Sequence, residues 1–139
     1  MNKLKFFFLF WIIFSFSDVK AELSNFEMGK NLFDEEKYDL AKFKFEQDIV
    51  YNPKKERSYL YLAKIFQNED NNELAEINLN TVLLINPKNE EAIFNLMKLQ
   101  IKKSNFSALN KNFELFKKVC KNLCFRSSEI SKEIKNFKK

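Results

Sequence analysis

The chain has 139 residues, a formal net charge of +5, a single glycine and no histidine. The lack of histidine removes imidazole-based triads and metal sites, and one glycine leaves no phosphate-binding loop. Only Arg57 and Arg126 are arginines among 24 basic residues, whereas nucleic-acid sites favour arginine. The composition argues against most enzymes, and we expect no catalytic residues, no metal, no cofactor and no nucleic-acid partner.

The first segment has the three regions of a secretory signal peptide. Residues 1–5 are basic, residues 6–16 form an apolar run, and residues 17–21 end in Ala21. The run is shorter than the roughly 20 residues that span a bilayer. We expect residues 1–21 to be removed and the protein to be exported, to the periplasm of a Gram-negative bacterium or as a secreted protein. The alternative is an uncleaved anchor, the one case in which we expect a membrane contact.

Apolar residues then recur at helical spacing and predict three pairs of helices. Polar turns separate the two helices of each pair, at residues 34–37, 68–72 and 102–105. Pro53 and Pro87 end the second helices of the first two pairs, and Asn89 is placed to cap the next helix. A last helix with one apolar stripe is expected through residue 136, with Ser127 as its cap, and such a helix suits the end of a stack.

The pairs recur about every 34 residues along the chain, and we call this spacing the repeat period. Small residues recur at this spacing on the first and second helices, where we expect them to let backbones approach closely. A lysine recurs in all three units. The recurring positions are Gly29 and Ala63, Ala41 and Ala75, Pro53 and Pro87, and Lys30, Lys64 and Lys98. A period of this length predicts stacked helical units that bury a continuous core.

This pattern resembles the tetratricopeptide repeat, a helix–turn–helix unit of about 34 residues. The repeats would be residues 22–55, 56–89 and a degenerate 90–123, followed by a capping helix and basic tail at 124–139. The third unit departs from the pattern at Met97, Leu109 and Lys121. The resemblance implies an all-α tetratricopeptide solenoid of about three repeats plus a C-terminal capping helix. The residues that carry it are Gly29, Leu32, Tyr38, Ala41, Phe45 and Pro53, and then Tyr59, Ala63, Phe66, Ala75, Leu79 and Pro87.

The resemblance also implies a protein-interaction function, with a partner segment in a concave groove lined by the first helices. Lys30, Lys64 and Lys98 would form a cationic ladder beside apolar pockets, which suits an acidic partner. The alternative is that these lysines are solvated and reflect a lysine-rich composition. The clamp that chaperone-binding members use for a C-terminal carboxylate is not reproduced. The expected groove residues are Phe26, Lys30, Phe33, Leu60, Tyr61, Lys64, Phe94, Asn95, Lys98 and Ile101.

Cys120 and Cys124 are four residues apart. They would either form a disulfide that ties the last repeat to the C-terminal segment or remain as two buried free thiols, since this spacing on a regular helix is near the distance limit of a disulfide.

The expected signal peptide, the repeats and the composition together predict a non-catalytic adaptor or scaffold that acts outside the cytoplasm. The alternative is a structural protein of the cell envelope, either self-associating or a membrane-tethered assembly factor.

Overall fold

The computed structural model describes residues 23–137, so the expected signal peptide lies outside the described residues. Within that range the chain forms α-helices and one short 3₁₀ turn, without a strand, which confirms the all-α prediction. The elements are α2 (Asn25–Asp34), α3 (Tyr38–Tyr51), α4 (Glu56–Asn68), α5 (Asn72–Ile85), α6 (Glu90–Lys102), α7 (Phe106–Val119), η2 (Cys124–Arg126) and α8 (Ser127–Phe137).

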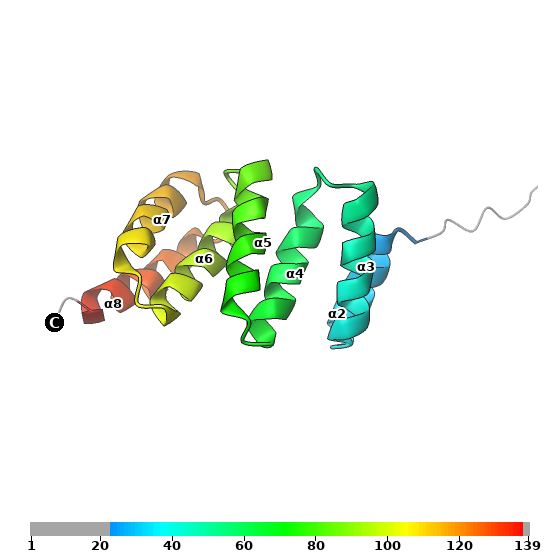
Figure 1. Ribbon diagram of the computed structural model, residues 1–139. Coiled ribbons are helices and arrows are strands. Elements are labelled where there is room, and N and C mark those ends of the chain that lie inside the picture. The colour runs from blue at the N-terminus through cyan, green and yellow to red at the C-terminus, as the bar shows by residue number, and fades with distance from the viewer. Residues whose placement is uncertain (1–22, 138–139) are drawn as a thin grey trace, which may run out of the picture.

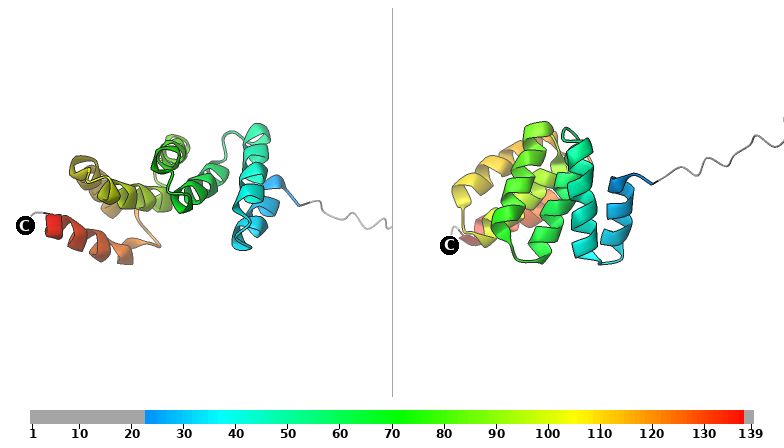
Figure 2. Two further views of the ribbon diagram at one scale, coloured as in Figure 1. Left: turned by 60° about the horizontal axis from the view of Figure 1, so that its bottom comes forward. Right: turned by 45° about the vertical axis from the view of Figure 1, so that its right-hand side comes forward.

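The helices pack as three antiparallel pairs, α2–α3, α4–α5 and α6–α7, and α8 packs against α6 and α7 at the end. Figure 1 shows the pairs following one another from right to left, and the turned views in Figure 2 show the same order. Each pair contributes to a core that continues into the next pair. This is the stacked arrangement that the repeat period predicts.

The turn inside each pair uses the same backbone device. Glu36, Asp70 and Ser104 have positive φ values of 60°, 57° and 54°, and they follow one another at the repeat period. After the first helix, the N–H of Lys37 donates to the carbonyl of Leu32 at 2.9 Å. This bond closes a Schellman motif, which glycine usually provides. The third unit therefore keeps the register of the other two through its turn.

Gly29 has a different role from the one expected of it. A Cβ atom at this position would lie 2.8 Å from Cε1 of Phe45, so the glycine makes room for an aromatic ring rather than for a backbone. Phe45 is fully buried and stacks on Tyr61 with 5.0 Å between ring centroids. In the second repeat the equivalent pair is Ala63 with Leu79, both fully buried. Gly29, which is smaller than Ala63, thus faces Phe45, whereas Ala63 faces Leu79, which is smaller than Phe45.

The two junctions between repeats differ in polarity. At the first, the buried Asp48 accepts hydrogen bonds from the Ser58 hydroxyl and, at 2.9 Å, from the Asn52 side-chain amide. At the second junction, one repeat later, Val82 and Ala92 occupy the positions of Asp48 and Ser58 and are fully buried. One junction is therefore held by hydrogen bonds to a carboxyl group and the other by apolar packing.

Two departures of the third repeat from the expected pattern lie in its core. Met97 and Leu109, which replace the usual small residues, are fully buried in its core. Asn89 caps α6 as expected, because its side chain accepts a hydrogen bond from the N–H of Ala92 at 3.0 Å. At the other end, Ser127 is the first residue of α8 rather than its cap.

Candidate partner-binding surface

The expected groove residues lie on α2, α4 and α6, the first helices of the three repeats. Ion pairs connect these helices in sequence. Arg57 on α4 is 3.7 Å from Glu27 on α2, and Lys64 on α4 is 2.6 Å from Glu91 on α6. These ion pairs link the three first helices, and the exposed side chains of α2, α4 and α6 form the surface considered for partner binding.

The apolar members of the expected groove are not open pockets, which corrects the prediction. Phe26, Leu60 and Phe94 are only 5%, 7% and 2% exposed and belong to the cores of the three repeats. Each side chain packs between its own helix pair and the next, because a stack buries one face of every first helix. These residues support the surface from below.

The two arginines cover two of these rings. The Cζ atom of Arg57 lies 3.8 Å from the ring centroid of Phe26, and that of Arg126 lies 3.9 Å from the centroid of Phe94. A guanidinium over an aromatic face is a favourable cation–π arrangement. Sequence reasoning gave these arginines no role, since each lies in the unit that follows its partner ring along the chain.

The lysine ladder is electrostatically uneven. Lys30 pairs with Asp34 at 2.9 Å, and this hydrogen-bonded carboxylate raises the pKa of Lys30. Lys64 is paired with Glu91 and lies 4.5 Å from the centroid of the Tyr61 ring. Among the residues that the structure describes, Lys98 has no carboxylate at ion-pair distance, and it is exposed. Of the three recurring lysines, Lys98 is therefore the one whose charge is available to a partner.

The other four expected residues are partly buried. Phe33 and Tyr61 meet edge to face with 5.1 Å between centroids. Ile101 packs against the core of the third repeat. Asn95 is part of the wall of a cleft. The expected groove is thus a mixed surface of half-buried aromatic, amide and lysine side chains.

A cleft of about 580 Å³ lies at the α6 end of this surface. Phe94 forms part of its floor beneath Arg126, and Asn95, Asn122 and Lys88 contribute polar groups to its wall. Amide side chains both donate and accept hydrogen bonds, so this lining matches the needs of a peptide backbone. The full lining is Lys88, Asn89, Glu90, Glu91, Phe94, Asn95, Asn122, Leu123 and Arg126.

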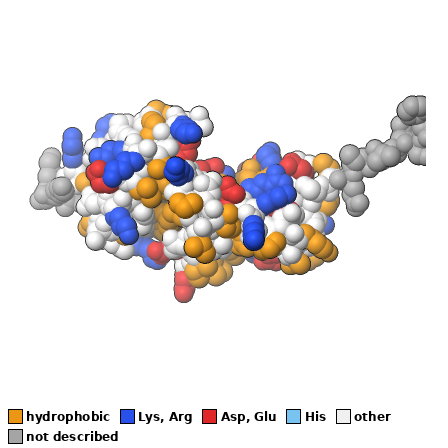
Figure 3. Space-filling view, turned by 90° about the horizontal axis from the view of Figure 1, so that it is seen from above, with side chains coloured by type: hydrophobic (Ala, Val, Ile, Leu, Met, Phe, Trp, Pro, Cys, Tyr) orange, Lys and Arg blue, Asp and Glu red, His pale blue; other side chains and the backbone are white. Residues whose placement is uncertain are grey.

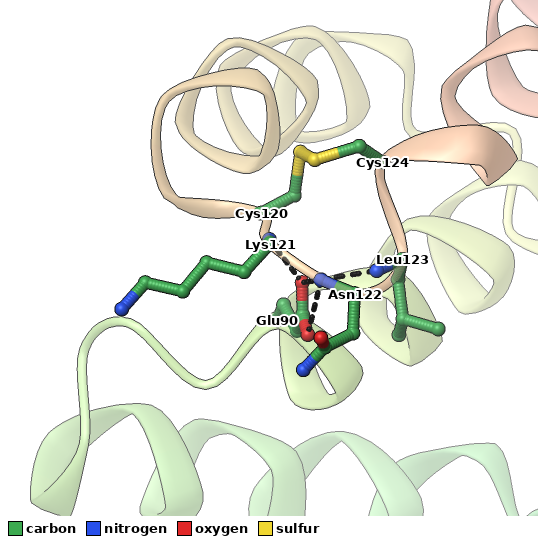
Figure 4. Close-up of a disulfide and its surroundings, with 6 residues drawn as sticks. All are labelled: Glu90, Cys120, Lys121, Asn122, Leu123 and Cys124. Atoms are coloured by element: carbon green, nitrogen blue, oxygen red, sulfur yellow. Dashed lines mark hydrogen bonds between the residues drawn. A yellow bond between two sulfur atoms is a disulfide. The ribbon is translucent and has the colours of Figure 1, made fainter.

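One wall of the cleft is fixed by a disulfide-closed loop. Cys120 and Cys124 are bonded to each other, and the carboxylate of Glu90 accepts hydrogen bonds from the backbone N–H groups of residues 121–123 at 2.6–3.2 Å. Figure 4 shows these groups converging on the carboxylate. Desolvation opposes ionisation of Glu90, but the three N–H donors outweigh it and lower the pKa. No motif or spacing in the sequence pointed to this contact.

No group of three or more Asp, Glu or Cys side chains in the part of the chain that the structure describes is arranged to hold a metal ion. Over the same residues, no helix combines the length and the apolar character needed to cross a bilayer.

Comparison with known proteins gives structural matches only. No protein-family model and no curated protein matches the sequence. The first tetratricopeptide domain of Spaghetti (RPAP3), bound to the HSP90 peptide SRMEEVD, aligns with a TM-score of 0.74 and 16% identity over 83% of this chain and 91% of that chain. The type III secretion chaperone SycD of Yersinia enterocolitica, in complex with a peptide of the translocator YopD, aligns with a TM-score of 0.73 and 17% identity over 82% and 89%.

These likenesses establish the fold. The chain has the tetratricopeptide-repeat fold, with three helix pairs and a C-terminal helix in the described residues. The resemblance inferred from the repeat period is confirmed at this level.

Proposed function

We propose that this protein is a non-catalytic adaptor that binds a segment of another protein on the surface formed by α2, α4 and α6. The cleft beside α6 carries the proposal, since it is large enough for several residues and is lined by amides and cations. Its two carboxylates are engaged within the fold, because Glu91 pairs with Lys64 and Glu90 accepts backbone N–H groups. In both structural neighbours the same fold carries a bound peptide. Lys98 and Lys88 are exposed, and they favour an acidic segment.

We further propose that the protein acts after export. The support is the order of basic, apolar and small residues at positions 1–21, together with the Cys120–Cys124 disulfide, since disulfides persist in oxidising compartments. Mass spectrometry of the protein isolated from its own cells tests this part. An N-terminus at Glu22 is expected, and an intact Met1 in the isolated protein would refute cleavage.

The binding surface is tested by site-specific photo-crosslinking in the same cells. A photoreactive residue replaces Asn95 in the cleft, and a control replaces Lys111, which is exposed on α7. The segment attached at position 95 is then synthesised, and its affinity for the purified protein is measured by calorimetry. We expect a segment captured at position 95 and not at position 111.

The structure ranks the lysines in this test. Lys98→Glu should weaken segment binding at least ten-fold, because it reverses an unpaired charge. Lys30→Glu should have a smaller effect, because Asp34 already neutralises Lys30. Binding should also weaken with added salt. Equal affinities for wild type and Lys98→Glu, or a loss no larger than that of Lys111→Glu, would refute the acidic-segment proposal.

A further inference from the structure

The loops between successive repeats lie in a row along one edge of the molecule, the upper edge in Figure 1. Hydrogen bonds connect them. Asn86 in the second loop donates its side-chain amide to Glu56, which follows the first loop, at 3.0 Å. Glu90, which follows the second loop, accepts the N–H groups of residues 121–123. The C-terminal ends of α3 and α5 meet this edge.

This edge carries an amphipathic patch. Val50, Tyr51 and Leu84 are 76%, 77% and 84% exposed, more than any other large hydrophobic residue that the structure describes. Lys54 and Lys55 lie in the loop that follows α3 and are exposed. We call these five residues the edge patch. Figure 3 looks onto this edge and shows basic side chains above hydrophobic ones along the lower margin, on the side of α3 and α5.

The charges of the edge patch differ from those at the opposite edge. There, Lys42 pairs with Glu69 at 3.1 Å and Lys102 pairs with Asp70 at 2.7 Å, so the lysines are neutralised within the fold. Among the described residues, no carboxylate lies at ion-pair distance from Lys54 or Lys55. The edge patch therefore combines exposed apolar side chains with cations that the fold leaves uncompensated.

The chemistry of this combination favours a lipid surface over a protein. Lysine is depleted from protein interfaces, whereas its long side chain places an ammonium among lipid headgroups while its stem follows the apolar boundary. Tyrosine is enriched at the membrane–water interface. In addition, the proposed export through residues 1–21 would bring the chain to a membrane.

We propose that the edge patch docks the folded domain on an anionic membrane surface. Val50, Tyr51 and Leu84 enter the headgroup region, and Lys54 and Lys55 bind anionic headgroups. The interaction is peripheral, and none of the five residues of the edge patch lines the cleft. Lys88, the equivalent of Lys54 in the next repeat, lies both at this edge and in the cleft.

The test is co-sedimentation with vesicles of phosphatidylcholine, with or without about one third phosphatidylglycerol. It uses the full chain and, in parallel, the form that begins at Glu22, which isolates the edge patch from the apolar run. The variants are Lys54→Glu/Lys55→Glu and, as a control with the same net charge, Lys111→Glu/Lys132→Glu on exposed positions of α7 and α8. Circular dichroism checks that each variant keeps its helical content.

We expect the Glu22 form to bind anionic vesicles and to bind neutral ones at least ten-fold more weakly. Each lysine at an anionic surface contributes about a five-fold change in binding, so the edge variant should lose at least ten-fold and the control less than three-fold. The full chain should show the same difference between the two variants on anionic vesicles. Equal losses in both variants, or no preference for anionic vesicles, would overturn the proposal.

A fluorescence measurement locates the contact. Trp11 is the only tryptophan, so in the Glu22 form Tyr51→Trp creates a single reporter at the edge, and Leu40→Trp places one about 16 Å away along α3. Anionic vesicles should shift the emission of the first to shorter wavelength and leave the second unchanged. A shift at both positions, or at neither, contradicts docking through the edge. Neither substitution touches the cleft, so segment binding at the cleft is measured independently.

Discussion

The polar junction between the first two repeats gives the sharpest test of how this stack is held together. Asp48 is 2% exposed, and its carboxyl group accepts hydrogen bonds from Ser58 and Asn52. Ser58→Ala should destabilise the protein by about 2 kcal/mol, because the buried carboxyl group of Asp48 loses a hydrogen-bond donor. Asp48→Val should cost a similar amount, since it leaves the buried hydroxyl of Ser58 without an acceptor.

The double variant Asp48→Val/Ser58→Ala reproduces the residues found at the second junction, Val82 and Ala92. Replacing both partners of a buried polar pair by apolar groups is often neutral or stabilising. We therefore expect the double variant to lie within about 1 kcal/mol of wild type, which corresponds to a coupling energy of at least about 3 kcal/mol in magnitude.

The assay is equilibrium unfolding in urea, followed by circular dichroism at neutral pH without reductant. Ser107→Ala, on an exposed position of α7, is the control for a serine with no buried partner. The slopes of the four transitions should agree, so that the midpoints report stability. If the double variant loses the sum of the single losses, or if Ser58→Ala costs no more than Ser107→Ala, the junction is not a coupled pair and the reasoning fails.

Two further predictions concern the first and third repeats. Gly29→Ala should destabilise the protein by about 1–2 kcal/mol, because overpacking against Phe45 exceeds the gain in helix propensity. The double variant Gly29→Ala/Phe45→Leu should be more stable than Gly29→Ala. A urea midpoint of the double variant below that of Gly29→Ala would contradict this. The lowered pKa of Glu90 means that its stabilisation is present above the ordinary value of 4.5 and is lost as the pH falls through the folded-state pKa. Wild type should therefore exceed Glu90→Gln in urea midpoint at neutral pH and approach it near pH 3, whereas a constant difference would refute the contribution of the N–H donors.

The sequence by itself determined the helices, their pairing and the fold. The apolar stripes, the prolines after the second helices and the repeat period are local or periodic signals, because each repeat makes the same contacts with its neighbours. Asn89 could be recognised as a cap for the same reason, since it bonds a residue three positions away. The period also located the surface, because first helices recur at equal intervals.

Only the tertiary structure decided what that surface offers. Phe26 and Phe94 have the spacing of groove residues, but arginines from the unit that follows each of them lie over their rings. Lys64 is neutralised by a carboxylate of the next repeat, whereas Lys98 is not. The repeat period predicts which face of a helix a side chain occupies. It does not predict which long side chain of the neighbouring repeat contacts that side chain. Such contacts depend on distances between residues about one repeat apart, and these distances are determined by the packing of the helices.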